Sequence, residues 1–168
     1  MASLIQSRSL EELLVTAIAM VSNRPVAIAT QSHINQFDKA GKPYIDHPLR
    51  VMGAGNTLPE KIVGVLHDAV EDSELTLVAL TEAGFPAEIV AAIDAITKRQ
   101  DEPYDTYLGR VMANSIALRV KIADMTDNMD ISRIAQPTDQ DWARLKKYET
   151  ILPRLRLQQE QGLKRRKD

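Results

Sequence analysis

The chain has 168 residues, of which 44% are hydrophobic and 26% are charged, with a formal net charge of −2 and no cysteine. This length fits one domain, and no apolar run approaches the roughly 18 residues that cross a bilayer. A slightly acidic chain argues against a broadly basic nucleic-acid-binding surface, and the lack of cysteine excludes disulfides, thiolate catalysis and cysteine zinc sites. We therefore expect a cytoplasmic protein with no DNA, RNA or membrane partner, whose metal ligands would be His, Asp or Glu.

Apolar residues recur at helical spacing along most of the chain, and no segment alternates apolar with polar residues, so the pattern predicts an all-α fold. A capping-box pattern at residues 9–12 begins a first helix, and Pro25 separates it from a second helix that runs through His33 and Gln36. Residues 1–168 are expected to form a single domain with a core at about residues 9–161 and a basic C-terminal tail.

The middle of the chain is predicted to alternate loops with short helices. Residues 38–48 contain a glycine and two prolines and no periodicity, so they should form a loop that presents His47, with Pro48 in the first turn of the next helix. A helix beginning at Leu58 carries apolar residues into the core and ends near His67. Further helices are predicted at residues 76–83, 86–98, 104–113, 115–133 and, with a candidate interruption at Pro153, about 139–161.

Acidic groups crowd the end of the helix that begins at Leu58. The pair His67-Asp68 is followed four residues later by Glu71-Asp72, one helical turn away if the helix continues. Crowded carboxylates repel one another and are costly to hold near a core unless a cation compensates them, which favours a divalent metal. A solvated helix end is the alternative interpretation.

Two further residues could complete such a metal site. His47 lies between a rigid PYID segment and a proline, which restricts the backbone around its imidazole. Asp124 lies within RVKIADMTDNMD among apolar residues, so its carboxylate would tend to be buried. Alone, His47 could be a surface residue and Asp124 could make a hydrogen bond between helices.

Taken in order, a His followed by proline, a His-Asp pair and an Asp in an apolar helix resemble the HD-domain superfamily. Within it, the chain resembles the hydrolase domain of RelA/SpoT-type enzymes and the small stand-alone alarmone hydrolases over about residues 28–148, through SHINQFDKAGKPYIDHPLRV, GVLHDAVEDSELTL, EIVAAIDAITK and VKIADMTDNM. The resemblance implies an HD-type helical bundle with a metal, usually manganese, held by His47, His67, Asp68 and Asp124. Nitrogen and carboxylate ligands suit manganese, and zinc and iron stay open.

The resemblance also implies the reaction, which is removal of pyrophosphate from the ribose 3′ position of a guanosine tetra- or pentaphosphate. In this interpretation the metal activates water, and Glu71 and Asp72 form the catalytic acidic pair, with the identity of the base left open. Residues implied to contact the substrate are Lys39, Asn128, Arg144 and Tyr148, for which a charged helix surface is the alternative. His33 and Gln36 are expected to give structural support.

One position departs from the family pattern. Alarmone hydrolases usually carry an arginine that packs against the guanine base directly before the lysine, and this chain has Asp38 there. A carboxylate supplies neither the planar stacking nor the positive charge of a guanidinium group. The sequence therefore does not decide which purine the site prefers, and an adenine alarmone such as pppApp becomes a candidate substrate.

Two other functions remain as alternatives. The chain could act on a different nucleotide, as a 5′-nucleotidase or a deoxynucleotide triphosphatase does, or it could bind an alarmone without turnover. No synthetase pattern and no glycine-rich phosphate loop accompany the hydrolase motifs, so we expect hydrolysis without synthesis. The sequence leaves homo-oligomer formation open.

Overall fold

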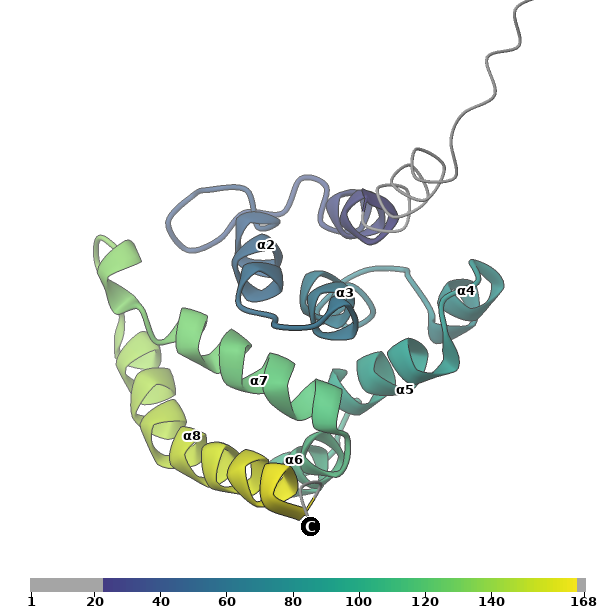
Figure 1. Cartoon of the computed structure of the whole chain (residues 1–168). Coiled ribbons are helices and arrows are strands. Elements are labelled where there is room, and N and C mark those ends of the chain that lie inside the picture. The colour runs from purple at the N-terminus through teal and green to yellow at the C-terminus, as the bar shows by residue number, and fades with distance from the viewer. Residues whose placement is uncertain (1–22, 166–168) are drawn as a thin grey trace, which may run out of the picture.

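Every regular element in the described part of this computed structural model, residues 23–165, is a helix, and this confirms the predicted all-α class. An isolated backbone bridge joins Phe37 and Pro43. Figure 1 shows the helices as a bundle crossed by α7. The elements are the helical residues 23–32, α2 (Asp46–Gly53), α3 (Leu58–Leu66), α4 (Leu77–Glu82), α5 (Ala87–Ile96), α6 (Tyr104–Ala113), α7 (Ser115–Asn128), the short 3-10 helix η1 (Ile131–Arg133) and α8 (Asp139–Arg165).

Side-chain caps begin three of these helices close to their predicted starts. Thr57 accepts a hydrogen bond from the Glu60 backbone N–H at 3.3 Å and begins α3, and Thr76 accepts one from Ala79 at 3.1 Å and begins α4. Asn114 caps α7 by accepting from two backbone N–H groups at 3.0 Å. Each cap satisfies amide groups that have no partner within their own helix.

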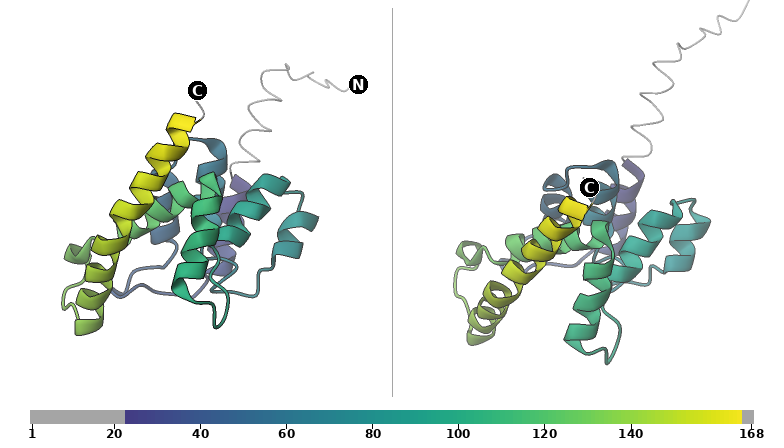
Figure 2. Two further views of the ribbon diagram at one scale, coloured as in Figure 1. Left: turned by 90° about the horizontal axis from the view of Figure 1, so that it is seen from below. Right: turned by 60° about the horizontal axis from the view of Figure 1, so that its bottom comes forward.

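Helix α7 lies between two hydrophobic clusters and is apolar on both sides. Ala117 and Val120 belong to the cluster that α3 and α5 also build, and Leu118 and Met125 belong to the cluster shared with α6 and α8. The views in Figure 2 show α8 running along the outside of this arrangement. The central position of α7 explains why Asp124, on its last turns, is buried.

The structure corrects the sequence-based boundaries around the first metal-ligand candidate. The second helix ends at residue 32 instead of running through His33 and Gln36, and Asn35 adopts a positive φ of 62°. Asparagine tolerates this left-handed conformation, which commonly ends a helix. The loop also ends earlier than predicted, because α2 begins at Asp46 and carries His47 in its first turn.

Two predictions near the C-terminal end were also inaccurate. The helix predicted at residues 115–133 ends at Asn128, and a separate 3-10 turn, η1, follows it. Pro153 does not interrupt α8. Proline leaves one carbonyl group of the preceding turn without its helical partner, but Pro153 is exposed, so water can satisfy that group, while Leu152 and Leu155 stay buried against α6 and α7.

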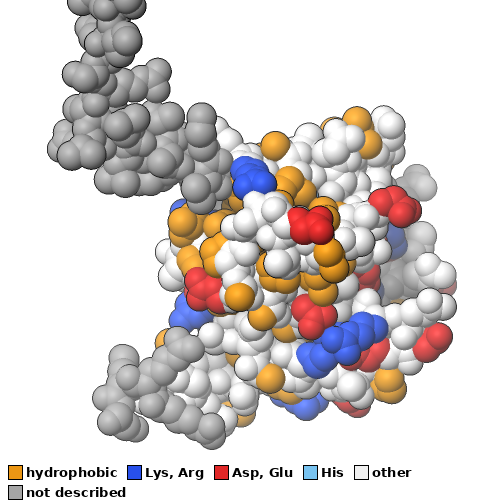
Figure 3. All heavy atoms as spheres, turned by 90° about the vertical axis from the view of Figure 1, so that its right-hand side faces the viewer, with side chains coloured by type: hydrophobic (Ala, Val, Ile, Leu, Met, Phe, Trp, Pro, Cys, Tyr) orange, Lys and Arg blue, Asp and Glu red, His pale blue; other side chains and the backbone are white. Residues whose placement is uncertain are grey.

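Some sequence features cannot be compared with the structure. The capping box at residues 9–12 and residues 166–168 of the basic tail lie outside the described residues. Among the described helices, none combines the length and the apolar character needed to cross a membrane. On the side that carries α4 and α5, hydrophobic side chains reach the surface among scattered charged ones (Figure 3), and Val78 of α4 is 65% exposed.

Candidate metal centre and adjoining cavities

Helices α2, α3 and α7 bring the predicted metal ligands together. One possible ligand atom from each of His47, His67 and Asp124 lies within 4.8 Å of the other two, and all three residues are buried. The Nε2 atoms of the two imidazoles lie 3.2 and 3.6 Å from Asp124 Oδ1. Asp68 Oδ2 lies 3.1 Å from His67 Nε2 and 3.7 Å from His47 Nε2. We call these four residues the cage.

The opposite nitrogen of each imidazole is fixed by a partner outside the cage. His67 Nδ1 donates to the Gly64 carbonyl at 2.8 Å, and His47 Nδ1 donates to Asp127 Oδ2 at 2.7 Å. Both Nε2 atoms are buried without a hydrogen-bond partner among the described residues. Imidazoles that bind metals usually donate their second N–H to a carboxylate or carbonyl, which turns the other nitrogen toward the ion. The cage therefore fits a metal ion.

The charges around the cage also favour a cation. Burial by itself lowers the pKa of His67, but the carboxylates of Asp68 and Asp124 outweigh burial and raise this pKa to about 10. Burial raises the pKa of Asp124, but Lys121 and the two imidazoles lower it well below the usual range, so this carboxylate stays ionised. The anionic side chains thus attract positive charge to the point where the two Nε2 atoms meet.

Several neighbours that we did not single out from the sequence hold the cage. The Tyr44 hydroxyl donates to Asp68 Oδ2 at 2.6 Å, and Lys121 Nζ donates to Asp124 Oδ2 at 2.7 Å. Asp127 accepts hydrogen bonds from Arg50 at 2.7 and 3.1 Å as well as from His47. Tyr44 lies three residues before His47, and Asp127 lies one helical turn beyond Asp124, so spacing was the available sequence signal.

Glu71 and Asp72, the predicted acidic pair, lie on the turn that follows α3. The Asp72 backbone N–H donates to the Asp68 carbonyl at 2.9 Å, which keeps one helix-like turn between the cage and the pair. Glu71 Oε2 accepts from the Lys98 backbone N–H at 2.9 Å. Burial, followed by the charges of Asp68 and Glu71, raises the pKa of Asp72. Both carboxylates line the same cavity as three cage residues.

That cavity, the reaction cavity, has a volume of about 560 Å³ and is lined by cationic and aromatic side chains beside the acidic pair. Three of the predicted substrate contacts line it, namely Asn128, Arg144 and Tyr148. Asn128 also donates to Asp124 Oδ1 at 2.6 Å. Further lining residues that the sequence reasoning did not identify are Lys98, Tyr104, Lys121 and Lys147. A cavity with this lining can hold a phosphorylated, aromatic ligand.

A smaller cavity of about 220 Å³, the side cavity, adjoins the reaction cavity, because Tyr44, Asn128 and Arg144 line both. The fourth predicted substrate contact, Lys39, lines the side cavity. Asp141, which is buried, accepts a hydrogen bond from Lys39 and also contacts Arg144 at 3.5 Å. One carboxylate thus connects two of the predicted substrate contacts.

Asp38, the departure from the family pattern, has a structural role in its loop. Its Oδ1 accepts hydrogen bonds from the backbone N–H groups of Ala40 and Lys42, each at 2.9 Å. Such local bonds from an aspartate side chain fix a tight turn. The carboxylate therefore organises the loop that carries Lys39.

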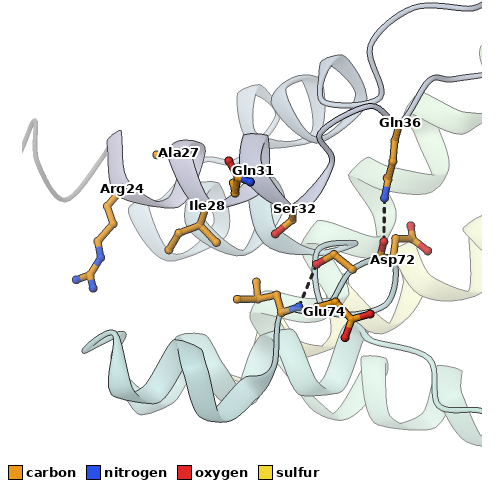
Figure 4. A pocket seen from close by; sticks show the side chains of 10 residues that line it. Arg24, Ala27, Ile28, Gln31, Ser32, Gln36, Asp72 and Glu74 are labelled. Carbon is orange, nitrogen blue, oxygen red and sulfur yellow. Dashed lines mark hydrogen bonds between the residues drawn. The ribbon is translucent and has the colours of Figure 1, made fainter.

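A third cavity, of about 740 Å³, lies behind Asp72 and contains none of the cage residues (Figure 4). Gln36 connects it to the site, since its Nε2 donates to the Asp72 carbonyl at 2.9 Å (Figure 4) and its Oε1 accepts from His33 Nδ1 at 2.8 Å. His33 and Gln36 therefore support the acidic turn without facing the cage.

Comparison with known proteins supports the class of protein that the motifs indicated. No family model matches the chain. The chain is similar in fold to a solved structure described as a metazoan orthologue of SpoT that hydrolyses ppGpp, with a TM-score of 0.64 and 20% identity, covering 87% of this chain and 95% of that one. At this identity the likeness shows the shared helical fold.

Sequence similarity leads to the same group of enzymes. The chain is 30% identical over 146 residues to a probable GTP pyrophosphokinase of Mycobacterium leprae, covering 79% of this chain. It is 32% identical over 117 residues to a guanosine-3′,5′-bis(diphosphate) 3′-pyrophosphohydrolase of Haemophilus influenzae, covering 61% of this chain, and 37% identical over 82 residues to a protein of the same name from Borreliella burgdorferi, covering 46%. The resemblance to alarmone enzymes is confirmed, and the chain spans 12% to 18% of the length of these relatives.

Proposed function

We propose that the chain is a metal-dependent 3′-pyrophosphohydrolase of (p)ppGpp or (p)ppApp that acts on its small nucleotide substrate in the cytoplasm. The observation that carries this proposal is the pair of buried Nε2 atoms, from His47 and His67, directed toward the carboxylates of Asp68 and Asp124 beside the reaction cavity. The names of the curated relatives supply the substrate class.

The four cage residues would hold the metal, and we propose manganese because two imidazoles with two carboxylates suit it. Bound there, a divalent cation would act as a Lewis acid toward a phosphoryl oxygen and increase the acidity of water. Gly64 and Asp127 each accept the Nδ1 proton of one imidazole, so Nε2 is the nitrogen that would face the ion.

Glu71 and Asp72 would orient a water molecule and accept its proton as the water oxygen forms a bond to the phosphorus atom next to the ribose. The bond from that phosphorus to the ribose 3′ oxygen breaks, the oxygen takes up a proton to give a hydroxyl group, and pyrophosphate is released. This role is supported by the position of Glu71 and Asp72, which lie one helical turn beyond Asp68 and line the reaction cavity. A raised pKa makes the Asp72 carboxylate a better proton acceptor than an ordinary aspartate.

The remaining predicted residues would bind the substrate. Arg144 and Lys39 would neutralise phosphate charge, and Tyr148 offers a ring or a hydroxyl group to the nucleoside. Asn128 lies between Asp124 and both cavities and could donate to a phosphate oxygen. Lys98, Lys121 and Lys147 add positive charge to the reaction cavity.

Product identity tests this proposal. Purified protein with manganese would be incubated with ppGpp, pppApp and a panel of 5′-nucleotides, and the products would be separated by chromatography. We expect pyrophosphate with GDP from ppGpp, or with ATP from pppApp, and no release of 5′ phosphates. Release of 5′ phosphates alone would support the second candidate, a phosphohydrolase of another nucleotide, which Asp38 favours because it supplies no guanidinium group for the guanine base.

A further inference from the structure

The side cavity presents an aromatic ring next to the cage. Phe37, which is 65% exposed, lines it together with the cage residue His47 and the cationic side chain of Lys39. Single exposed apolar side chains are common on proteins and by themselves indicate nothing. This ring differs because it lies in a cavity that shares Asn128 and Arg144 with the reaction cavity.

The loop that carries Phe37 is held by backbone and side-chain bonds on both sides of the ring. Phe37 pairs with Pro43 in the isolated bridge, the Tyr44 backbone N–H donates to the Gln36 carbonyl at 2.9 Å, and the Asp38 backbone N–H donates to the Lys42 carbonyl at 2.8 Å. The Asp38 carboxylate closes the same turn, as described above. The ring is therefore presented by a preorganised loop, which reduces the entropy lost on binding.

A second anchor fixes this loop relative to α8. Lys39, two residues after Phe37, donates to the buried carboxylate of Asp141 on the first turn of that helix. Arg144, one turn further along α8, contacts the same carboxylate and lines both cavities. The loop that carries Phe37 and the helix that carries Arg144 are thus linked through the contact between Lys39 and Asp141.

The two cavities offer different groups to a nucleotide. The reaction cavity holds the acidic pair and lysines suited to phosphate groups, and the side cavity adds the aromatic ring of Phe37 to a lining that also includes charged side chains such as Arg50, Asp127 and Arg133. Purine bases stack on aromatic rings in nucleotide-binding proteins, and the ring tolerates either guanine or adenine because both have a π face. The carboxylate of Asp38 offers no flat surface on which a purine could stack.

We infer that Phe37 stacks against the purine base of the substrate and thereby takes the place of the arginine that Asp38 replaces; this inference rests on the proposed function. Base stacking that is removed by alanine substitution weakens binding by roughly fivefold to a hundredfold. Phe37→Ala should therefore raise the KM for ppGpp within this range and leave kcat within about a factor of two, because the ring and the acidic pair line different cavities.

The experiment compares Phe37→Ala, Phe37→Leu and Phe37→Trp with Val78→Ala, which truncates an equally exposed residue on α4. Steady-state kinetics with ppGpp would be combined with inhibition by GDP, which has a base, and by inorganic pyrophosphate, which has none. We expect Phe37→Ala and Phe37→Leu to raise KM and weaken inhibition by GDP, with inhibition by pyrophosphate unchanged. Phe37→Trp should restore both properties, and Val78→Ala should match the wild type.

The outcomes separate this inference from the proposed function. If the wild type releases pyrophosphate from ppGpp but Phe37→Ala keeps its KM, or Phe37→Leu behaves as the wild type, base stacking by Phe37 is wrong and the hydrolase proposal stands. An equal loss of inhibition by GDP and by pyrophosphate would also contradict stacking, because it would show a general disturbance of the site. If the wild type releases pyrophosphate from neither ppGpp nor pppApp, both proposals fail.

Discussion

The ammonium group of Lys39 and the buried carboxylate of Asp141 connect the loop before α2 to the first turn of α8. Thr138 completes the contact, because its backbone N–H and its hydroxyl group donate to Asp141 Oδ2 at 3.0 and 2.7 Å. Lys39 and Asp141 are 102 positions apart in the sequence. The contact positions Lys39, which we propose to bind the substrate, through a carboxylate on a different element.

Asp141→Asn should loosen this connection. Without the charge, Lys39, whose side chain is 50% exposed, regains rotamer freedom, so amide hydrogen exchange at Ala40 and Lys42 should become faster and the KM for ppGpp should rise roughly tenfold. Thr138→Val, which removes a hydroxyl partner and leaves the charge, should have a smaller effect on KM. A decrease in KM would instead show that Asp141 merely competes with phosphate for the two cations.

Glu71→Gln tests the proposed acidic pair. A glutamine keeps the shape of the side chain and can still accept from the Lys98 backbone N–H, but it cannot accept a proton. The kcat should fall roughly a hundredfold to ten-thousandfold, as for loss of a general base, while calorimetric manganese affinity stays near that of the wild type. Glu74→Gln, an exposed acid three residues further along the chain, is the control and should keep its activity. Unchanged turnover in Glu71→Gln would remove this residue from the mechanism.

Asp127→Asn tests whether the hydrogen bond from His47 to Asp127, a residue outside the cage, contributes to metal binding. Burial raises the pKa of Asp127, but hydrogen bonds from Arg50 and His47 lower it to about 2, so the native residue is an anion. Loss of this charge weakens the hydrogen bond that orients His47, and manganese affinity should fall roughly 10- to 100-fold. Asp130→Asn, an exposed neighbour, should not change it. Equal affinity in both variants would argue against a role for Asp127 in metal binding.

The ion pair between Glu102 and Arg110, which lies away from the cage, should make a contribution to stability that is lost in acid. Its carboxylate accepts from Arg110 at 2.7 and 2.8 Å, and mainly this contact lowers its pKa from 4.5 to about 2. A lowered folded-state pKa stabilises the protein above about pH 4.5, and this contribution disappears as the pH falls toward about 2. Glu102→Gln should therefore lower the free energy of unfolding at pH 7, and the difference from the wild type should shrink below pH 4.5.

Urea unfolding at a series of pH values measures this difference, with Glu149→Gln, which replaces an exposed acid on α8, as the control. A gap between wild type and Glu102→Gln that stays constant from pH 7 to pH 3 would contradict the proposed ionic contribution.

The helical class could be predicted from local apolar periodicity, whereas the four cage residues were proposed as metal ligands from the resemblance to a family. Periodic apolar residues define the helices, and His67 and Asp68 follow directly after α3. Helix termination was less predictable. It depended on the left-handed Asn35 and, for Pro153, on burial of Leu152 and Leu155 in a distant cluster.

The residues that support the site were missed for a related physical reason. Asp141 lies in the polar start of a long helix, where a solvated acid is the ordinary expectation, and only the tertiary fold brings Lys39 to it. Tyr44 and Asp127 likewise obtain their roles from contacts with Asp68 and His47 across separate helices. Spacing places Tyr44 and Asp127 near His47 and Asp124, but it does not show which side chains they contact across the helices, and it carries no information on the pairing of Lys39 with Asp141.

The most direct test of the central proposal is the rate of pyrophosphate release from ppGpp by metal-stripped protein as manganese is added. The rate should be near zero without metal, rise with added manganese and saturate near one equivalent per chain, whereas folded His67→Ala should stay inactive at the same metal concentrations. Full activity in the stripped wild type, or in His67→Ala, would contradict a cage built on His47, His67, Asp68 and Asp124.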